Sequence, residues 1–140
     1  MQVDGACHCG KITFSAQADP NYAVLCHCRD CQIMSGAPYR SILPVKELAY
    51  KLLSGDPKIY FKVGDSGNRR ELAFCGDCGS HIYATSVVED VPRGERMLGL
   101  RTGMLAQVAE LSPKRQVWCD SKIDWAQNLL ALNVQEQNGQ

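Results

Sequence analysis

The sequence predicts a mainly β fold organised around zinc-binding cysteine knuckles. Three observations support this prediction. Many short segments are rich in β-branched and aromatic residues or alternate polar with apolar side chains. Gly- and Pro-containing turns separate these segments. Seven of the eight cysteines are grouped at the short spacings that metal ligands use. We expect one domain over residues 1–140, with its core at about residues 3–125 and a polar C-terminal tail.

Short strands and turns are expected throughout the first half of the chain. Residues 5–10 form a turn of small residues that carries two cysteines, and residues 11–15 alternate as a half-buried strand does. Asp19-Pro20-Asn21 reads as a turn. The further strands expected here are residues 22–25, 39–43 and 58–63. Pro44 ends the second of these, and residues 45–53 fit either a helical turn or an extended segment.

The second half continues with strands and ends in a polar tail. A loop at residues 64–68 begins this half. The strands that follow are expected at residues 69–74, 80–88, 96–102 and 116–119. Residues 105–111 show no clear pattern. Trp118 and Trp125 are interpreted as core anchors. A helix is expected from Ala126 through Leu129, Leu130 and Leu132, before a polar end.

Charge and hydropathy exclude several classes of partner. Fifteen basic residues balance fifteen acidic ones, and the only short basic runs are Arg69-Arg70 and Lys114-Arg115, so no nucleic-acid partner is expected. No signal peptide is apparent, and no apolar run approaches the roughly 20 residues that span a bilayer. We therefore expect a cytoplasmic protein without a membrane partner. In a reducing compartment, eight cysteines favour metal ligation over a disulfide scaffold.

Seven of the cysteines divide into a group of four and a group of three. They occur in sequence as a pair, a trio and a second pair: Cys7 and Cys9; Cys26, Cys28 and Cys31; Cys75 and Cys78. A structural zinc site takes four ligands, whereas a catalytic one keeps an open position beside three protein ligands. The outer pairs together make a closed site that clips distant parts of the chain, and the trio is one ligand short. We expect two zinc ions per chain, the second more easily lost.

Other ligand sets remain open on spacing alone. Cys119 could complete the trio, although a lone cysteine beside tryptophan favours a small buried hydrophobe. His27 and His81 are also possible ligands. However, His27 lies between two cysteines that would share an ion, so its side chain should point away, and the same holds for His8. For His81, a structural role within a strand is favoured.

The cysteine groups and their neighbours resemble a known family. The pattern is Gly5-x-Cys7-x-Cys9-Gly10, then Cys26-His27-Cys28-x-x-Cys31 followed by Ser35-Gly36-Ala37, then Cys75-x-x-Cys78-Gly79. It is similar to that of the glutathione-dependent formaldehyde-activating enzymes, a family that also contains the centromere protein V domain. The likeness extends over roughly Val3 to Trp125 and includes the Gly-Asp-Pro-x-x-Tyr segment that ends at Tyr60.

The resemblance implies a tent-shaped, Mss4-like β fold with two zinc sites. It also implies the founding activity of the family, a carbon–sulfur lyase reaction written in the synthetic direction, in which glutathione and formaldehyde form S-hydroxymethylglutathione. By position, the structural zinc ligands are Cys7, Cys9, Cys75 and Cys78. The ligands of the catalytic zinc are Cys26, Cys28 and Cys31.

Three thiolates suit a thiol substrate better than hydrolysis. Electron-rich sulfur weakens the Lewis acidity of zinc, but a soft site accepts a further thiol and lowers its pKa. Our hypothesis is that the trio binds a substrate thiol and presents it to a small aldehyde; in a second version zinc polarises the aldehyde. Arg29 and Arg40 are candidates for binding the carboxylates of glutathione, although an exposed surface position is favoured for both.

Two further classes of function are consistent with the same residues. A non-catalytic glutathione-, thiol- or zinc-binding module would use the trio without turnover. A structural interaction domain, like the centromere relative, would bind neither a thiol nor an aldehyde as substrate. This class is disfavoured because the chain lacks a basic tail. Of these three classes, we favour the zinc-dependent lyase-type enzyme.

Overall fold

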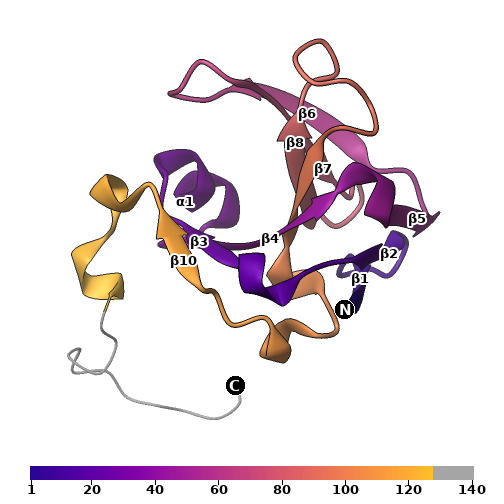
Figure 1. Cartoon of the computed structure of the whole chain (residues 1–140), viewed down its shortest axis with the longest axis horizontal. Helices are drawn as coiled ribbons and strands as arrows, with labels where there is room; N and C mark the ends of the chain where they lie inside the picture. The colour runs from indigo at the N-terminus through magenta and orange to yellow at the C-terminus, as the bar shows by residue number, and fades with distance from the viewer. Residues whose placement is uncertain (128–140) are drawn as a thin grey trace.

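The computed structural model describes residues 1–127 and places them in two β-sheets and one α-helix (Figure 1). The helix α1 is Arg29–Ser35. The strands within the described residues are β1 Gln2–Ala6, β2 Thr13–Gln17, β3 Val24–Cys26, β4 Arg40–Lys46, β5 Tyr50–Ser54, β6 Lys58–Val63, β7 Arg69–Phe74, β8 His81–Ser86, β9 Met97–Arg101 and β10 Arg115–Val117. Short 3-10 turns occupy Pro20–Tyr22, Glu47–Ala49, Thr102–Met104, Val108–Glu110, Cys119–Ser121 and Asp124–Ala126. Among residues 1–127, no helix has the length and apolar character needed to span a bilayer.

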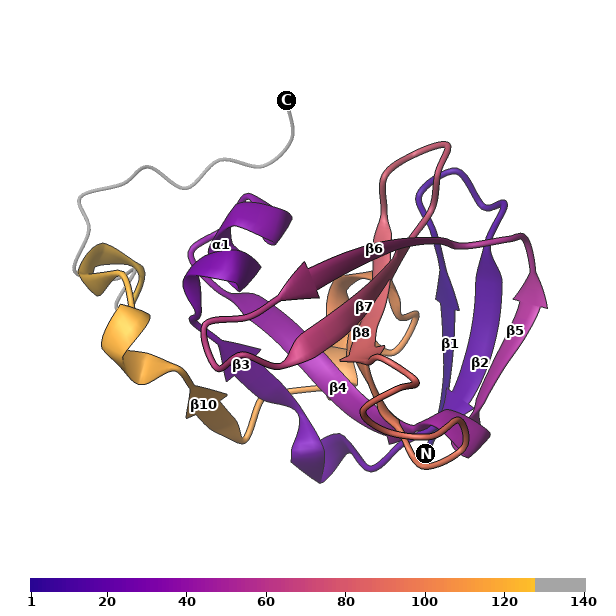
Figure 2. The same cartoon turned by 90° about the horizontal axis from the view of Figure 1, so that it is seen from above.

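The strands form a small sheet and a large one. The small sheet has the order β1-β2-β5, and all its pairs are antiparallel. The large sheet has the order β10-β3-β4-β9-β8-β7-β6, in which only the pair of β10 with β3 is parallel. In both views α1 lies at the β3 end of the large sheet, and the loop joining β6 to β7 reaches toward it (Figures 1 and 2).

The two faces of the large sheet have different roles. Leu43 pairs with Leu100 between β4 and β9, and these side chains lie in the buried core with residues of the small sheet such as Phe14. Successive residues of a strand point to opposite faces. Ile42 of β4 and its partner Arg101 of β9 therefore lie on the other face, away from the core. That second face carries the candidate site.

The predicted mainly β fold is confirmed, with corrections to several elements. The prediction that Pro44 ends its strand is wrong, because β4 continues to Lys46. The strand β3 pairs with β4 only as far as Ile42, so one edge of β4 has no partner strand at Pro44. Proline lacks a backbone N–H and is tolerated at such an unpaired edge. Residues 45–53 are extended apart from one 3-10 turn. The strand β1 and the helix α1 were not predicted. The predicted C-terminal helix falls almost wholly outside the described residues.

The predicted burial of the tryptophans is wrong. Trp118 and Trp125 are 52% and 56% exposed, so neither is a core anchor. Cys119 is exposed and is not a small buried hydrophobe. All three follow β10, the edge strand of the large sheet, and no strand within residues 1–127 pairs beyond it.

Candidate functional site

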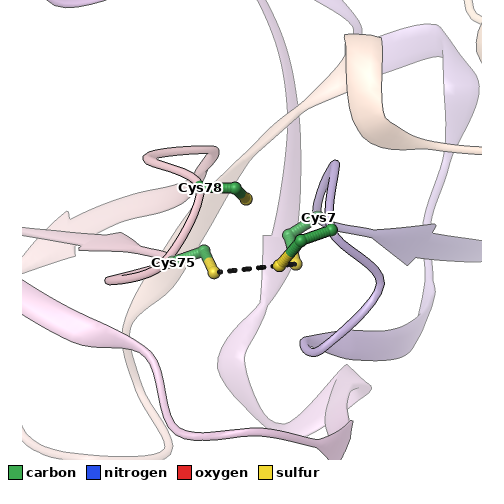
Figure 3. Close-up of side chains that lie close together, drawn as sticks. Cys7, Cys75 and Cys78 are labelled. Atoms are coloured by element: carbon green, nitrogen blue, oxygen red, sulfur yellow. Dashed lines mark hydrogen bonds between the residues drawn. The ribbon is translucent and has the colours of Figure 1, made fainter.

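Four sulfurs meet where two turns from different sheets face each other. The turn between β1 and β2 contributes Cys7 and Cys9, and the turn between β7 and β8 contributes Cys75 and Cys78. Figure 3 shows the labelled Cys7, Cys75 and Cys78 with their sulfurs directed into a common space. We call this group the four-sulfur cluster. It ties the small sheet to the large one, and Cys7 and Cys75 belong to the hydrophobic core.

A glycine with positive φ follows each cysteine pair. Gly10 and Gly79 have φ values of 76° and 75°, which favour residues without a Cβ. The backbone N–H groups of Gly10 and Gly79 donate to the carbonyl oxygens of Cys7 and Cys75, each at 2.9 Å. The Ile12 N–H donates to Cys7 Sγ at 3.2 Å. One backbone N–H group is thus directed at a sulfur of the first turn, and it belongs to Ile12, two residues after Gly10.

Ser80 links the two knuckles. The backbone N–H of His8 donates to Ser80 Oγ at 3.0 Å, and Ser80 Oγ lies 3.2 Å from Cys78 Sγ. Hydrogen bonds from the side chain and then the backbone of Ser80 lower the pKa of the Cys78 thiol to about 5. Sequence reasoning missed this serine, because nothing in the spacing showed that it would reach the opposite turn.

The geometry of the four-sulfur cluster fits a tetrahedral ion. Four sulfurs about 2.3 Å from one zinc ion lie about 3.8 Å apart in a tetrahedron. The Sγ atoms of Cys9 and Cys75 are 3.8 Å apart and those of Cys7 and Cys9 are 3.5 Å apart. These separations exceed the roughly 2.05 Å of a disulfide bond, and all eight cysteines are free. A donor set of four thiols at these separations suits zinc.

The remaining three sulfurs gather around the first turn of α1, and we call them the trio. Cys26 ends β3, Cys28 is the N-cap residue of α1, and Cys31 follows in the helix. Their sulfurs lie within 4.8 Å of one another. The Cys31 N–H donates to Cys28 Sγ at 3.4 Å, because an N-cap side chain accepts from this position. A hydrogen bond from Cys31 lowers the pKa of Cys26, whereas burial raises the pKa of Cys28.

The alternative ligands lie outside both clusters. His27 Nε2 makes a 2.8 Å hydrogen bond with Gln116 Oε1, so the ring is directed toward β10. His81 Nδ1 is buried without a hydrogen-bond partner among the described residues, and His81 belongs to neither group of sulfurs. Cys119 is exposed and separate from the trio. Within residues 1–127, no fourth cysteine, histidine or carboxylate joins the trio.

The trio opens into a cavity of about 280 Å³. The second face of the large sheet forms its floor, and α1, the β6–β7 loop and Trp118 surround it. The lining side chains from the floor are Cys26, Arg40, Ile42, Arg70, Leu72, Ala84 and Arg101. Lys62 of β6 forms an ion pair with Asp30 of α1, which holds the β6–β7 hairpin against the helix. The four-sulfur cluster has no residue in this cavity.

Arginines reach this cavity from the sheet. Arg40 is buried and lines the cavity, so the exposed position favoured for it from the sequence is wrong. Arg29 is exposed, donates to Gln32 Oε1 at 3.1 Å and does not line the cavity. Arg101 was not singled out from the sequence, although an arginine that ends the apolar strand Met97–Arg101 was an available signal.

The two clusters on a two-sheet scaffold define a cysteine-rich β domain that could hold two metal ions, one among four sulfurs and one beside a cavity. The comparisons narrow this class. A family model described as glutathione-dependent formaldehyde-activating enzyme (GFA) matches residues 2–121, so the chain belongs to that family, as its cysteine pattern indicated. No curated protein gives a match.

One solved structure supports the fold. A crystal structure of a Rhodobacter sphaeroides protein is similar with a TM-score of 0.60 and 17% sequence identity, and the match covers 81% of this chain and 99% of that chain. At this identity the likeness concerns the fold alone. It agrees with the mainly β prediction made from the sequence.

Proposed function

We propose that this chain is a zinc-dependent carbon–sulfur lyase-type enzyme that acts on a thiol–aldehyde adduct, such as the S-hydroxymethylglutathione formed from glutathione and formaldehyde. Membership of the formaldehyde-activating family supports glutathione and formaldehyde as the small-molecule partners. The observation that carries the proposal is the contrast between the two clusters. The four-sulfur cluster offers four ligands and lies outside the cavity, whereas the trio offers only three and lies on the wall of the cavity. We place the reaction in the cytoplasm, where thiols stay reduced.

The proposed reaction joins sulfur to carbon without a redox change. The thiolate sulfur attacks the carbonyl carbon, a carbon–sulfur bond forms, and the carbonyl oxygen takes up a proton to become a hydroxyl group. The reverse reaction breaks the same bond and returns the thiol and the aldehyde. When bound by Cys26, Cys28 and Cys31, zinc would supply an open position that suits a thiolate and would lower the pKa of that thiol.

The residues of the chain have separate tasks in this proposal. The trio provides the sulfur donors at one wall, and the sheet floor with Ile42 and Leu72 excludes water from that end of the cavity. The Lys62–Asp30 ion pair keeps the β6–β7 hairpin close to the helix, so that the cavity stays enclosed on that side. Holding thiol and aldehyde together in this space reduces the entropic cost of a bimolecular addition.

A rate measurement at limiting protein concentration tests the proposal. Thiols add to formaldehyde without a catalyst, so the zinc-loaded protein must accelerate adduct formation above that background. We expect acceleration by the wild type and by Cys119→Ser, whose cysteine is exposed and outside both clusters, and none by Cys28→Ser. If the wild type binds glutathione but gives only the background rate, the protein is a thiol-binding module and the proposed enzyme activity is wrong. Equal rates for wild type and Cys28→Ser would remove the trio from the chemistry.

A further inference from the structure

Arg40 and Arg101 are buried cations without an acidic partner among the described residues. They are 6% and 9% exposed, and Nε of Arg101 is buried with no hydrogen-bond partner. Another buried arginine of this chain, Arg96, does have acidic partners. It is 3% exposed and forms ion pairs with both Glu47 and Glu71. The lack of an acidic ion-pair partner for Arg40 and Arg101 is therefore particular to the cavity, since the buried Arg96 has such partners.

Strand pairing places both guanidinium groups on the same sheet face as the trio. Arg40 of β4 is the direct partner of Cys26 of β3, so their side chains share a face. Two residues further along β4, Ile42 is the partner of Arg101, which puts Arg101 on that face as well. Both arginines line the cavity beside the sulfurs. The charge of each also interacts with the thiol of Cys31.

Two buried positive charges favour an anion between them. Removing a guanidinium group from water is costly unless the charge is paired, and burial lowers the pKa of both Arg40 and Arg101. A carboxylate can accept two parallel hydrogen bonds from one arginine, which makes it a well-matched partner. We propose that Arg40 and Arg101 form a carboxylate-binding subsite beside the trio, so that the reacting thiol or its carbonyl partner carries a carboxylate close to the reacting atom.

The charges around the cavity agree with one bound anion. Four cations line it, Arg40, Lys62, Arg70 and Arg101, against the two acids Asp30 and Asp65. A zinc ion with three thiolates has a formal charge of −1. One positive charge then remains, and a single carboxylate would neutralise it. Lys62 is already paired with Asp30, so the free charge lies with the arginines.

The dimensions of the cavity limit the distance between carboxylate and sulfur. Its volume of about 280 Å³ lies just below the range of about 300–1,000 Å³ that is usual for ligand pockets. The small residue Ala84 lines the floor, whereas Ile42 packs over the neighbouring Gly99, where an added Cβ would approach Ile42 Cγ2 to 3.0 Å. A compact mercapto-acid or oxo-acid fits this space, as does the thiol end of a larger molecule. This inference rests on the proposed function, because it places the anion relative to the reacting group.

Matched ligands test the subsite in the zinc-loaded full chain by calorimetric titration. The first pair is 3-mercaptopropionate and 3-mercaptopropan-1-ol, and the second is glyoxylate and glycolaldehyde. Within each pair only one member carries a carboxylate. We expect the acid of one pair to bind at least about tenfold tighter than its neutral partner, since charge-assisted hydrogen bonds exceed neutral ones. The pair that shows the difference identifies whether the thiol or the carbonyl compound carries the carboxylate.

Variants assign the effect to the arginines. The preference should fall in Arg40→Gln and Arg101→Gln, be partly kept in Arg40→Lys, and persist in Arg69→Gln, which removes an exposed arginine paired with Asp90. The ligand comparison in the wild type stands even if a variant does not fold. Equal or absent binding of the acids and their neutral partners would overturn the inference, as would a preference that survives both glutamine substitutions. Catalysis without this preference overturns the inference alone, and carboxylate binding without catalysis overturns only the proposed function.

Discussion

The same substitution, cysteine to serine, should have different effects in the two clusters. Cys9 and Cys75 are separated by 66 residues, so a metal ion held by the four-sulfur cluster closes a long loop. For a cross-link over this length, the lost entropy of the unfolded chain is worth roughly 4 kcal/mol. The trio spans only the residues from Cys26 to Cys31, and closing so short a segment adds little. Cys78→Ser should therefore affect stability, whereas Cys28→Ser should affect binding and catalysis.

Denaturant unfolding with metal analysis measures both effects. For Cys78→Ser prepared with zinc, we expect loss of the ion that closes this loop. The free energy of unfolding should then fall by about 4 kcal/mol, with Tm lower by on the order of 10 °C. For Cys28→Ser we expect a fall of about 1 kcal/mol or less and the loss of one zinc ion per chain. Treatment of the wild type with a chelator should reproduce the larger loss once the ion of the four-sulfur cluster is removed.

Two results would refute this reasoning. If Cys78→Ser and Cys28→Ser lowered the free energy of unfolding by the same amount, loop length would not determine the contribution of each cluster. If the metal-free wild type unfolded at the same denaturant concentration as the zinc-loaded protein, the four-sulfur cluster would not be a stabilising metal site at all.

Further predictions concern packing, pH and the remaining cysteine. In Gly5→Ala the new Cβ would lie 2.2 Å from Cζ of the buried Phe14, so the free energy of unfolding should fall by about 1–3 kcal/mol in urea unfolding. Arg96 lowers the pKa of Glu47, so this pair stabilises the fold above the pKa of the unfolded carboxyl and loses that contribution as pH falls through the lower folded pKa. Unfolding of Glu47→Gln measured from pH 7 to pH 3 should show a smaller dependence on acid and a loss of about 1–3 kcal/mol at pH 7. Cys119→Ser should leave the zinc content and the unfolding midpoint unchanged, because Cys119 is exposed and outside both clusters.

The packing and pH predictions each have a matched control. Gly103→Ala has no atom within 4 Å of the new Cβ and should be neutral, unlike Gly5→Ala. Glu89→Gln removes a carboxylate that is exposed and should not change the acid limb of unfolding. A stable Gly5→Ala, an unaltered acid limb in Glu47→Gln, or zinc lost from Cys119→Ser would each contradict the corresponding argument.

The sulfur groups could be predicted because their information is local. Cys26, Cys28 and Cys31 lie within six residues, and the turn around Cys75 and Cys78 ends in a glycine suited to a knuckle. The joining of the outer pairs followed from counting ligands. The fold class was predictable for the same reason, since short β-rich segments and turn residues are visible without tertiary structure.

The cavity could not be predicted, because its residues are brought together by strand register. Arg101 reaches the trio only because β9 pairs with β4 at Ile42, a contact that no spacing along the chain encodes. The predicted burial of the tryptophans was wrong for a different reason. Their apolar character suggested burial, but Trp118 lies after the last strand and beside the cavity, where few elements can cover it. The helix α1 was not predicted because it has only seven residues, and its cysteine Cys31 was interpreted as a metal ligand and not as part of a helical pattern.

The parallel pairing of β10 with β3 affects the order in which the protein matures. The backbone N–H of His27 donates to Val117 O, and His27 is 89 residues before its side-chain partner Gln116. During translation, β3 therefore leaves the ribosome long before β10 is available to cover its free edge. The four-sulfur cluster is complete in the nascent chain once Cys78 has emerged, whereas the strand that leads into the trio gains its last neighbour only after Val117. All seven cysteines of the two clusters have therefore emerged before the free edge of β3 is covered.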